Sequence, residues 1–173
     1  EEIDKERFVI ATYYAAGRPE TNMIKFAAAL AVEQTCGTWL KVPGETPEVR
    51  ERSIGRVLGV YEAPAYQIGI PAEVTERHFI IRIAYPWKNF GQQFSMMLST
   101  VIGNISSSGK VKLIDLEFPK SFLEGFKGPK FGISGIRQIL GVYDRPLLNN
   151  MIKPCIGLTP EKTAELAYEA AVG

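Results

Sequence analysis

The order in which strand-like and helix-like apolar patterns follow one another constrains the fold of this chain most strongly. The strand-like runs are residues 8–14, 54–61, 79–85 and 111–118, and the helical stripes are residues 23–34 and 94–102. Thr21 or Asn22 can serve as the N-cap of the first helix, and the Gly103-Asn104 pair suits a left-handed cap after the second. The order strand, helix, two strands, helix, strand predicts an α+β sandwich, with one antiparallel, ferredoxin-like sheet covered on one face by two helices.

The last third of the chain has a different pattern. Short helical pieces at 121–126 and 134–140 flank a glycine-containing connector, and an apolar run follows at 147–152. Thr159-Pro160-Glu161 then supplies an N-cap, a proline at the first helical position and an acid in the first turn. A strand, a loop and a helix in this order predict the first βα unit of a larger parallel sheet, because one parallel strand cannot form a sheet alone.

Charge and cysteine content exclude several classes of function. Lys plus Arg number 20 and Asp plus Glu number 19, so a net charge of +1 disfavours a general nucleic-acid or membrane-surface binder. Cys36 and Cys155 are far apart and belong to no Cys/His cluster, which disfavours a zinc site or a disulfide framework and indicates a reducing, cytoplasmic compartment. No apolar run is long enough for a membrane helix, so we expect a soluble protein.

Few residues suggest chemistry by their type and position alone. His78, the only histidine, stands among charged neighbours at the start of a strand, and we interpret it as structural or solvent-facing. The 128–132 connector has the wrong spacing for a phosphate-binding loop, and the serines before Gly109 favour a flexible turn. Lys153 follows an apolar strand directly, where (β/α) folds place catalytic groups, and a partly desolvated lysine there could move protons. An exposed loop lysine is the alternative.

Five ordered sequence blocks carry a resemblance to a known family. The blocks are Ala31-Val32-Glu33-Gln34-Thr35-Cys36-Gly37-Thr38-Trp39, Ile83-Ala84-Tyr85-Pro86, Val101-Ile102-Gly103-Asn104, residues 126–133, and Arg145-Pro146-Leu147 with residues 152–158. In this order the chain resembles the RuBisCO large-chain superfamily over nearly its whole length. The stretch 110–140 is most similar to the RuBisCO-like (form IV) proteins, the branch that does not fix carbon dioxide.

The resemblance implies a domain organisation and a shared active site. It implies an N-terminal α+β domain at 1–140 and, at 141–173, the first strand and helix of a truncated (β/α)8 TIM barrel. In that family the N-terminal domain of one subunit closes over the barrel of its partner, so the resemblance implies a homodimer. It also implies a phosphorylated sugar as substrate.

Site residues follow from the same resemblance, position by position. Thr38 and Trp39 would help to hold the substrate phosphate, and Glu33 and Asn104 would line the site from the partner subunit. Lys153 would transfer the proton during enolisation. The resemblance implies Mg²⁺ as cofactor, held by a carbamylated lysine and two acids that are expected beyond residue 173.

Two departures from the family pattern narrow the expected reaction. Cys155 stands where carbon-fixing members carry a second lysine, and a neutral thiol cannot supply that charge, which disfavours carboxylation of ribulose bisphosphate. Asn104 stands where the methionine-salvage enolases carry their basic lysine, and an amide cannot act as that base. We therefore assign the base to Lys153.

The expected function is that of a RuBisCO-like enolase or isomerase. The reaction would be Mg²⁺-dependent enolisation of a phosphorylated sugar derivative, such as a methylthio-sugar phosphate of sulfur salvage. The alternatives that stay open are decarboxylation or transcarboxylation of a 3-oxo sugar-acid phosphate, true carboxylation, and a non-catalytic fragment or dimerisation module.

Overall fold

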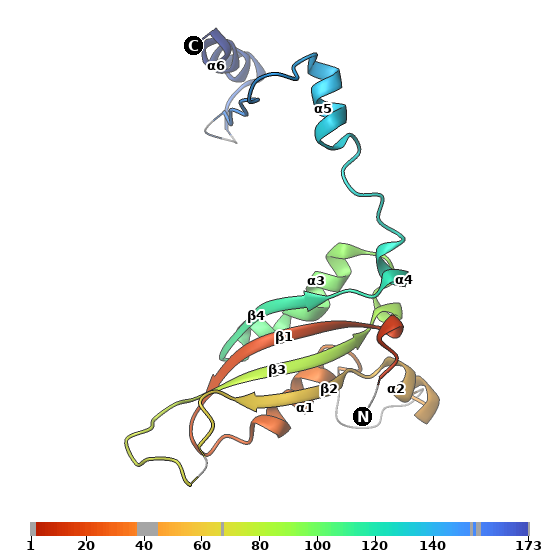
Figure 1. The fold of residues 1–173 in the computed structure, drawn as a ribbon, viewed down its shortest axis with the longest axis vertical. Coiled ribbons are helices and arrows are strands. Elements are labelled where there is room, and N and C mark those ends of the chain that lie inside the picture. Colours follow the sequence, from red (N-terminus) through yellow and green to blue (C-terminus); the bar gives the residue numbers. More distant parts are fainter. Residues whose placement is uncertain (1–2, 38–44, 67, 153, 155–156, 173) are drawn as a thin grey trace. The chain divides into compact units, whose positions relative to one another are not determined.

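The chain forms two compact units, Glu1–Lys127 and Gly128–Gly173. A computed structural model describes residues 3–37, 45–66, 68–152, 154 and 157–172, and Figure 1 shows its elements in chain order. The boundary predicted at residue 140 concerns the domains of the whole protein and stays a prediction.

The first unit is built on one antiparallel sheet of four strands. Their order is β2-β3-β1-β4, and β1 in the centre pairs with β3 on one side and β4 on the other. The strands are β1 (Phe8–Gly17), β2 (Arg56–Glu62), β3 (Arg77–Pro86) and β4 (Lys110–Glu117). The four predicted strands are confirmed, with ends shifted by a few residues.

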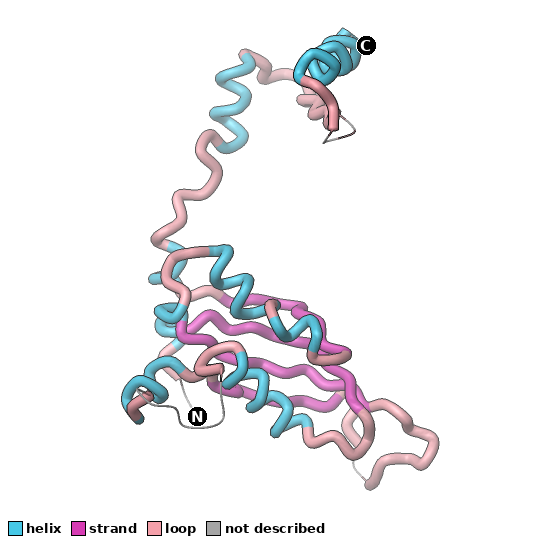
Figure 2. Tube along the Cα trace, turned by 180° about the vertical axis from the view of Figure 1, so that it is seen from behind, coloured by secondary structure: helices cyan, strands magenta, loops and turns pink. Residues whose placement is uncertain are grey.

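Two helices cover one face of this sheet, as Figure 2 shows. They are α1 (Met23–Glu33) and α3 (Phe94–Ile102), and the side chain of Asn22 caps α1 by accepting a hydrogen bond from the Lys25 N–H at 3.0 Å. The predicted sandwich of one sheet and two helices is therefore confirmed. The shorter elements are η1 (Lys5–Arg7), α2 (Pro47–Ser53), η2 (Trp87–Asn89), η3 (Asn104–Ser107) and α4 (Lys120–Leu123).

Strand alternation places the core between the sheet and the helices. Every second residue of β1 from Val9 to Ala15 is fully buried, and the matching residues of β3 are buried as well. Phe122 of α4 closes one end of this core, with its ring centroid 5.8 Å from that of Phe90. The core of the first unit is thus complete within that unit.

One helix was not predicted and one local expectation is wrong. The turn signals at residues 43–47 predict a connection, and the sequence analysis gives no helix after it, but α2 begins at Pro47, with the Thr46 hydroxyl accepting from the Val49 N–H. Gly103 has a φ of −54° and is not left-handed. A glycine is needed there for space, because a Cβ would lie 2.2 Å from the Ser99 carbonyl oxygen. The sequence also predicts a short extended segment at 38–42, and these residues lie outside the described part of the chain.

The second unit contains α5 (Gly132–Leu140) and α6 (Pro160–Val172). The predicted start of α6 is confirmed, since the Thr159 hydroxyl accepts a hydrogen bond from the Lys162 N–H at 3.2 Å. Residues 147–152 form no strand in this structure. A parallel strand needs hydrogen bonds from neighbouring strands, and the described part of this unit contains none. The barrel assignment of 141–173 rests on the family.

Candidate functional site

The structure brings together two of the predicted site residues, Glu33 and Asn104. Glu33 is the last residue of α1 and Asn104 the first of η3, and the Asn104 Nδ2 donates a hydrogen bond to the Glu33 Oε1 at 3.2 Å. Both side chains are exposed to a cleft of about 400 Å³. The cleft is lined by Phe26, Ala29, Leu30, Glu33, Asn104, Ser107 and Ser108.

The backbone of Asn104 is fixed by its own neighbours. The hydroxyls of Ser107 and Ser108 donate hydrogen bonds to its carbonyl oxygen at 2.8 and 3.2 Å. The serine run was expected to be a flexible turn, and it contributes instead to a short 3-10 helix whose first residue is Asn104. Together with the tight approach at Gly103, these bonds set the direction in which the Asn104 side chain leaves the backbone.

The end of α3 is held by side chains from two other elements. The last carbonyls of a helix have no partners within the helix. The Tyr13 hydroxyl of β1 donates to the Val101 carbonyl oxygen at 2.7 Å. The Gln34 amide is oriented so that its nitrogen donates to the Thr100 carbonyl oxygen at 2.9 Å and its oxygen accepts from the Ile105 N–H at 3.1 Å. Gln34 follows Glu33 directly and Ile105 follows Asn104, so this amide links the two halves of the pair.

Burial keeps the supporting tyrosines protonated. The hydroxyl oxygens of Tyr13 and Tyr85 are 3.2 Å apart, and both side chains are fully buried. Loss of solvation raises the pKa of Tyr13, and the nearby Tyr85 raises it further. Burial likewise raises the pKa of Tyr85. Tyr13 therefore remains a hydrogen-bond donor to α3 across the whole range of ordinary pH.

The residues that lead up to Thr38 and Trp39 in the sequence are held by side-chain hydrogen bonds. The Thr35 hydroxyl donates to the Ala31 carbonyl oxygen at 2.6 Å and accepts from the Gly55 N–H at 3.0 Å. Gly55 allows this approach, because a Cβ there would lie 2.7 Å from the Ala31 carbonyl oxygen. The end of α1 is thus tied to the segment before β2.

Three of the predicted site residues, Thr38, Trp39 and Lys153, lie outside the described residues. Within the described ranges, no group of three or more His, Cys, Asp or Glu side chains could hold a metal ion. The cleft offers the Glu33 carboxylate and the Asn104 amide oxygen, which are oxygen donors but too few for a magnesium site. No helix in the described part of the chain is long and apolar enough to cross a membrane.

His78 lies on the opposite face of the sheet from the helices. Its Nδ1 is 2.5 Å from the Tyr14 hydroxyl, its ring stacks on that of Tyr14, and its Nε2 is 3.9 Å from a Glu76 carboxylate oxygen. The ion pair with Lys110 lowers the pKa of Glu76. None of these residues lines the Glu33–Asn104 cleft, which agrees with a structural role for His78.

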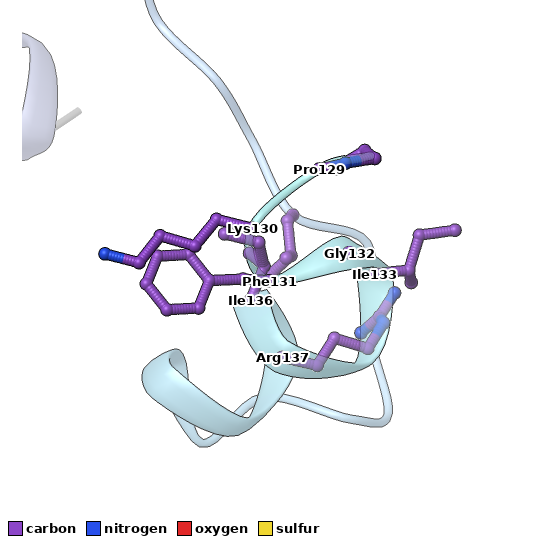
Figure 3. A pocket seen from close by; sticks show the side chains of 8 residues that line it. Pro129, Lys130, Phe131, Gly132, Ile133, Ile136 and Arg137 are labelled. Carbon is purple, nitrogen blue, oxygen red and sulfur yellow. The ribbon is translucent and has the colours of Figure 1, made fainter. Parts of the chain in front are cut away.

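A hollow in the second unit contains none of the predicted site residues. It measures about 680 Å³ and lies against α5, as Figure 3 shows. Its apolar lining includes Phe131, Ile133, Ile136 and Leu147, and its charged residues are Lys130 and Arg137. The apolar side chains of α5 are exposed in this unit, which indicates a helix face built for packing against other protein.

Sequence reasoning missed the residues that support the pair. Gln34 stands in the quoted sequence block, but its partners are backbone atoms of a helix that is distant in the sequence. No pattern of residue types in the sequence predicts a contact of this kind. The serine run offered a weak signal, because Ser side chains often bond to nearby backbone carbonyls.

Comparison with known proteins decides the family. A family model described as "Ribulose bisphosphate carboxylase large chain, N-terminal domain" matches residues 2–122. A ribulose bisphosphate carboxylase-like protein of Archaeoglobus fulgidus is 56% identical over 173 residues, which is 100% of this chain and 40% of that protein. The chain belongs to the RuBisCO large-chain family. Within it, the chain belongs to the RuBisCO-like branch, as the sequence blocks predicted.

Two relatives with named activities are equally similar to this RuBisCO-like chain. A 3-oxo-isoapionate-4-phosphate transcarboxylase/hydrolase of Xanthobacter autotrophicus is 37% identical over 95% of this chain and 41% of that protein. A 2,3-diketo-5-methylthiopentyl-1-phosphate enolase of Bacillus licheniformis is 37% identical over 95% of this chain and 39% of that protein. The chain therefore spans about two fifths of the length of these relatives.

Solved structures show the same fold. A rubisco-like protein from Alicyclobacillus acidocaldarius has a TM-score of 0.69 and 34% identity, covering 95% of this chain and 39% of that one. A dimeric archaeal Rubisco from Hyperthermus butylicus has a TM-score of 0.69 and 29% identity, covering 99% of this chain and 38% of that one. The RuBisCO-like chain shares its N-terminal fold with both branches of the family.

Proposed function

We propose that the whole protein enolises a phosphorylated sugar derivative, as an enolase or isomerase of the methylthio-sugar type. The observation that carries this proposal is the Glu33–Asn104 pair in its cleft. One N–H of the Asn104 amide is used by Glu33, so one N–H and the amide oxygen remain for substrate. A fixed N–H donor can stabilise the negative oxygen that develops when a proton leaves the carbon beside a carbonyl.

The other residues have roles that the family resemblance supplies. Lys153, in its neutral form, takes the proton from the carbon next to the carbonyl. Thr38 and Trp39 hold the phosphate, and Glu33 and Asn104 act on a substrate held in the barrel of the partner subunit of a homodimer. The proposed cofactor is Mg²⁺, which supplies positive charge beside the enediolate and whose ligands we expect beyond residue 173. We place the reaction in the cytoplasm.

Deuterium exchange tests this proposal directly. The full-length protein is incubated in D₂O with Mg²⁺ and bicarbonate, and NMR follows deuterium entry into 2,3-diketo-5-methylthiopentyl-1-phosphate, methylthioribulose 1-phosphate and ribulose 1,5-bisphosphate. We expect exchange into one of them. Lys153→Met should abolish exchange without loss of phosphate-ligand binding, while Lys162→Met on the exposed surface of α6 should leave the rate unchanged. Unchanged exchange in Lys153→Met rejects Lys153 as the base.

Asn104 also favours a second candidate, the decarboxylation or transcarboxylation of a 3-oxo sugar-acid phosphate. By the resemblance, this residue replaces the basic lysine of the methionine-salvage enolases, and the Xanthobacter transcarboxylase is as similar to this chain as the Bacillus enolase is. Absence of exchange in all three substrates, with release of CO₂ from a 3-oxo sugar-acid phosphate, would establish this second function instead.

A further inference from the structure

A second cleft of about 400 Å³ lies at the end of the sheet where β1 begins and β3 ends. Figure 1 shows α2 and α4 at this same end of the sheet. The lining comes from five elements, η1, α2, β3, η2 and α4, and it shares no residue with the Glu33–Asn104 cleft. The lining residues are Glu6, Arg7, Arg52, Pro86, Trp87, Lys88 and Ser121.

Hydrogen bonds between these elements build the cleft in advance of any ligand. The Trp87 Nε1 and the Ser121 hydroxyl both donate to the Glu6 carbonyl oxygen, at 3.0 and 2.9 Å. The Asn89 amide donates to the Ser53 carbonyl oxygen at 2.7 Å, which joins η2 to α2. The indole ring and the residues around it are therefore held in place, so ligand binding does not require the loss of conformational entropy that ordering them would cost.

The charged residues that line this cleft are three cations and one carboxylate. Arg7, Arg52 and Lys88 come from three different elements, and none of them forms an ion pair with any described carboxylate. Glu6 supplies the single carboxylate of the lining, and that carboxylate accepts a hydrogen bond from the Ser121 N–H at 3.2 Å. Three cations gathered in one hollow repel each other unless an anion compensates them.

We propose that this basic cleft binds a small anionic ligand that carries a phosphate group. The volume suits a small molecule, and two guanidinium groups and an ammonium group match the donors that phosphate oxygens accept. The site is independent of the enolisation proposed above, because its residues come from other elements. Its ligand is recognised by charge and hydrogen bonding, with the fixed Trp87 indole forming one wall.

Calorimetric titration of the full-length protein with inorganic pyrophosphate tests the site. The key variant is the double substitution Arg52→Gln with Lys88→Gln, and the matched control is Lys25→Gln with Lys112→Gln, which removes the same amount of charge from α1 and β4. We expect the dissociation constant to rise about tenfold or more in the cleft variant and to stay unchanged in the control. Added NaCl should weaken the binding.

A third variant separates this site from the catalytic one. Trp39→Ala, which removes a residue that we assign to the substrate phosphate, should leave pyrophosphate binding to the basic cleft intact. The proposal is overturned if the cleft variant binds pyrophosphate as tightly as the unmodified protein, if Trp39→Ala removes the binding, or if no binding is detected at millimolar concentration. Failure of the enolisation test would leave this result unaffected.

Discussion

The Tyr13 hydroxyl connects the core with the candidate site through a hydrogen bond. It donates to the Val101 carbonyl oxygen, one turn before Asn104, from a fully buried position in β1. Leaving a buried carbonyl oxygen without a donor costs more free energy than its hydrogen bond contributes as net stabilisation. The site thus depends on a hydrogen bond made from the centre of the sheet.

Tyr13→Phe is therefore expected to lower the free energy of unfolding by about 1–3 kcal/mol, because it leaves the Val101 carbonyl buried without a donor. Urea denaturation followed by circular dichroism measures the change. Tyr85→Phe is the matched control, since it removes a neighbouring buried hydroxyl and keeps the bond to Val101. Equal destabilisation by both variants would contradict a special role for the Val101 contact.

The pair of Glu62 and Arg77 predicts a pH dependence at the other end of the sheet. The Arg77 Nε and Nη2 donate to the two Glu62 carboxylate oxygens at 2.5 and 2.6 Å, and this bonding lowers the pKa of Glu62 below 4.5. A lowered pKa in the folded state stabilises the fold above pH 4.5. The stabilisation is lost as the pH falls through the folded pKa.

Glu62→Gln should therefore lower the melting temperature at pH 7. The melting temperature of this variant should also decrease less on acidification than that of the unmodified protein. The effect should be modest, because solvent screens a partly exposed pair. Thermal unfolding from pH 7 to about pH 3 measures it, with Glu73→Gln in the exposed β2–β3 loop as the control. An unchanged pH profile in Glu62→Gln would show that the pair does not contribute.

At the scale of elements, Gln34 connects the end of α1 with the turn between α3 and η3. Gln34→Ala removes the donor to the Thr100 carbonyl and the acceptor for the Ile105 N–H. We expect a slower turnover of the proposed reaction with a smaller change in KM, since Asn104 would lose its fixed position while the phosphate contacts remain. Gln138→Ala on exposed α5 is the control, and a rise in KM alone would contradict a positioning role.

The sequence predicted the elements whose apolar residues recur at a regular spacing. Two similar N-cap signals show why the helix α2 was not predicted. Thr46-Pro47-Glu48 and Thr159-Pro160-Glu161 each have an N-cap, a proline and an acid, and both begin helices. Only the second is followed by a long stripe of alanine and leucine. No described residue of α2 is buried, so its sequence carries no periodic signal. The link between α1 and α3 depends on tertiary contacts that no local pattern encodes.

At the scale of the molecule, the first unit contains its own complete core. We expect a fragment of residues 1–127 to fold cooperatively, with the circular dichroism and dispersed NMR signals of a native domain. A fragment of residues 1–117 is the control, because it lacks Phe122, which is fully buried against Phe90 and Trp87. Loss of that side chain should lower stability by about 3–5 kcal/mol. Equal stability of both fragments would contradict this account of α4.

The central place of β1 in the sheet sets the order of events during synthesis. Of the four strands, β1 is synthesised first, and its two neighbours in the sheet begin only at Arg77 and Lys110. Until β3 and β4 have been synthesised, the edges of the apolar strand β1 are not both paired. Pairing them requires the long connections between these strands to become ordered, which costs conformational entropy. The contact between Glu33 and Asn104 joins residues that are 71 positions apart, so a nascent chain can form this pair only after η3 has been synthesised, and the unpaired edges of β1 are open to aggregation until its partner strands follow.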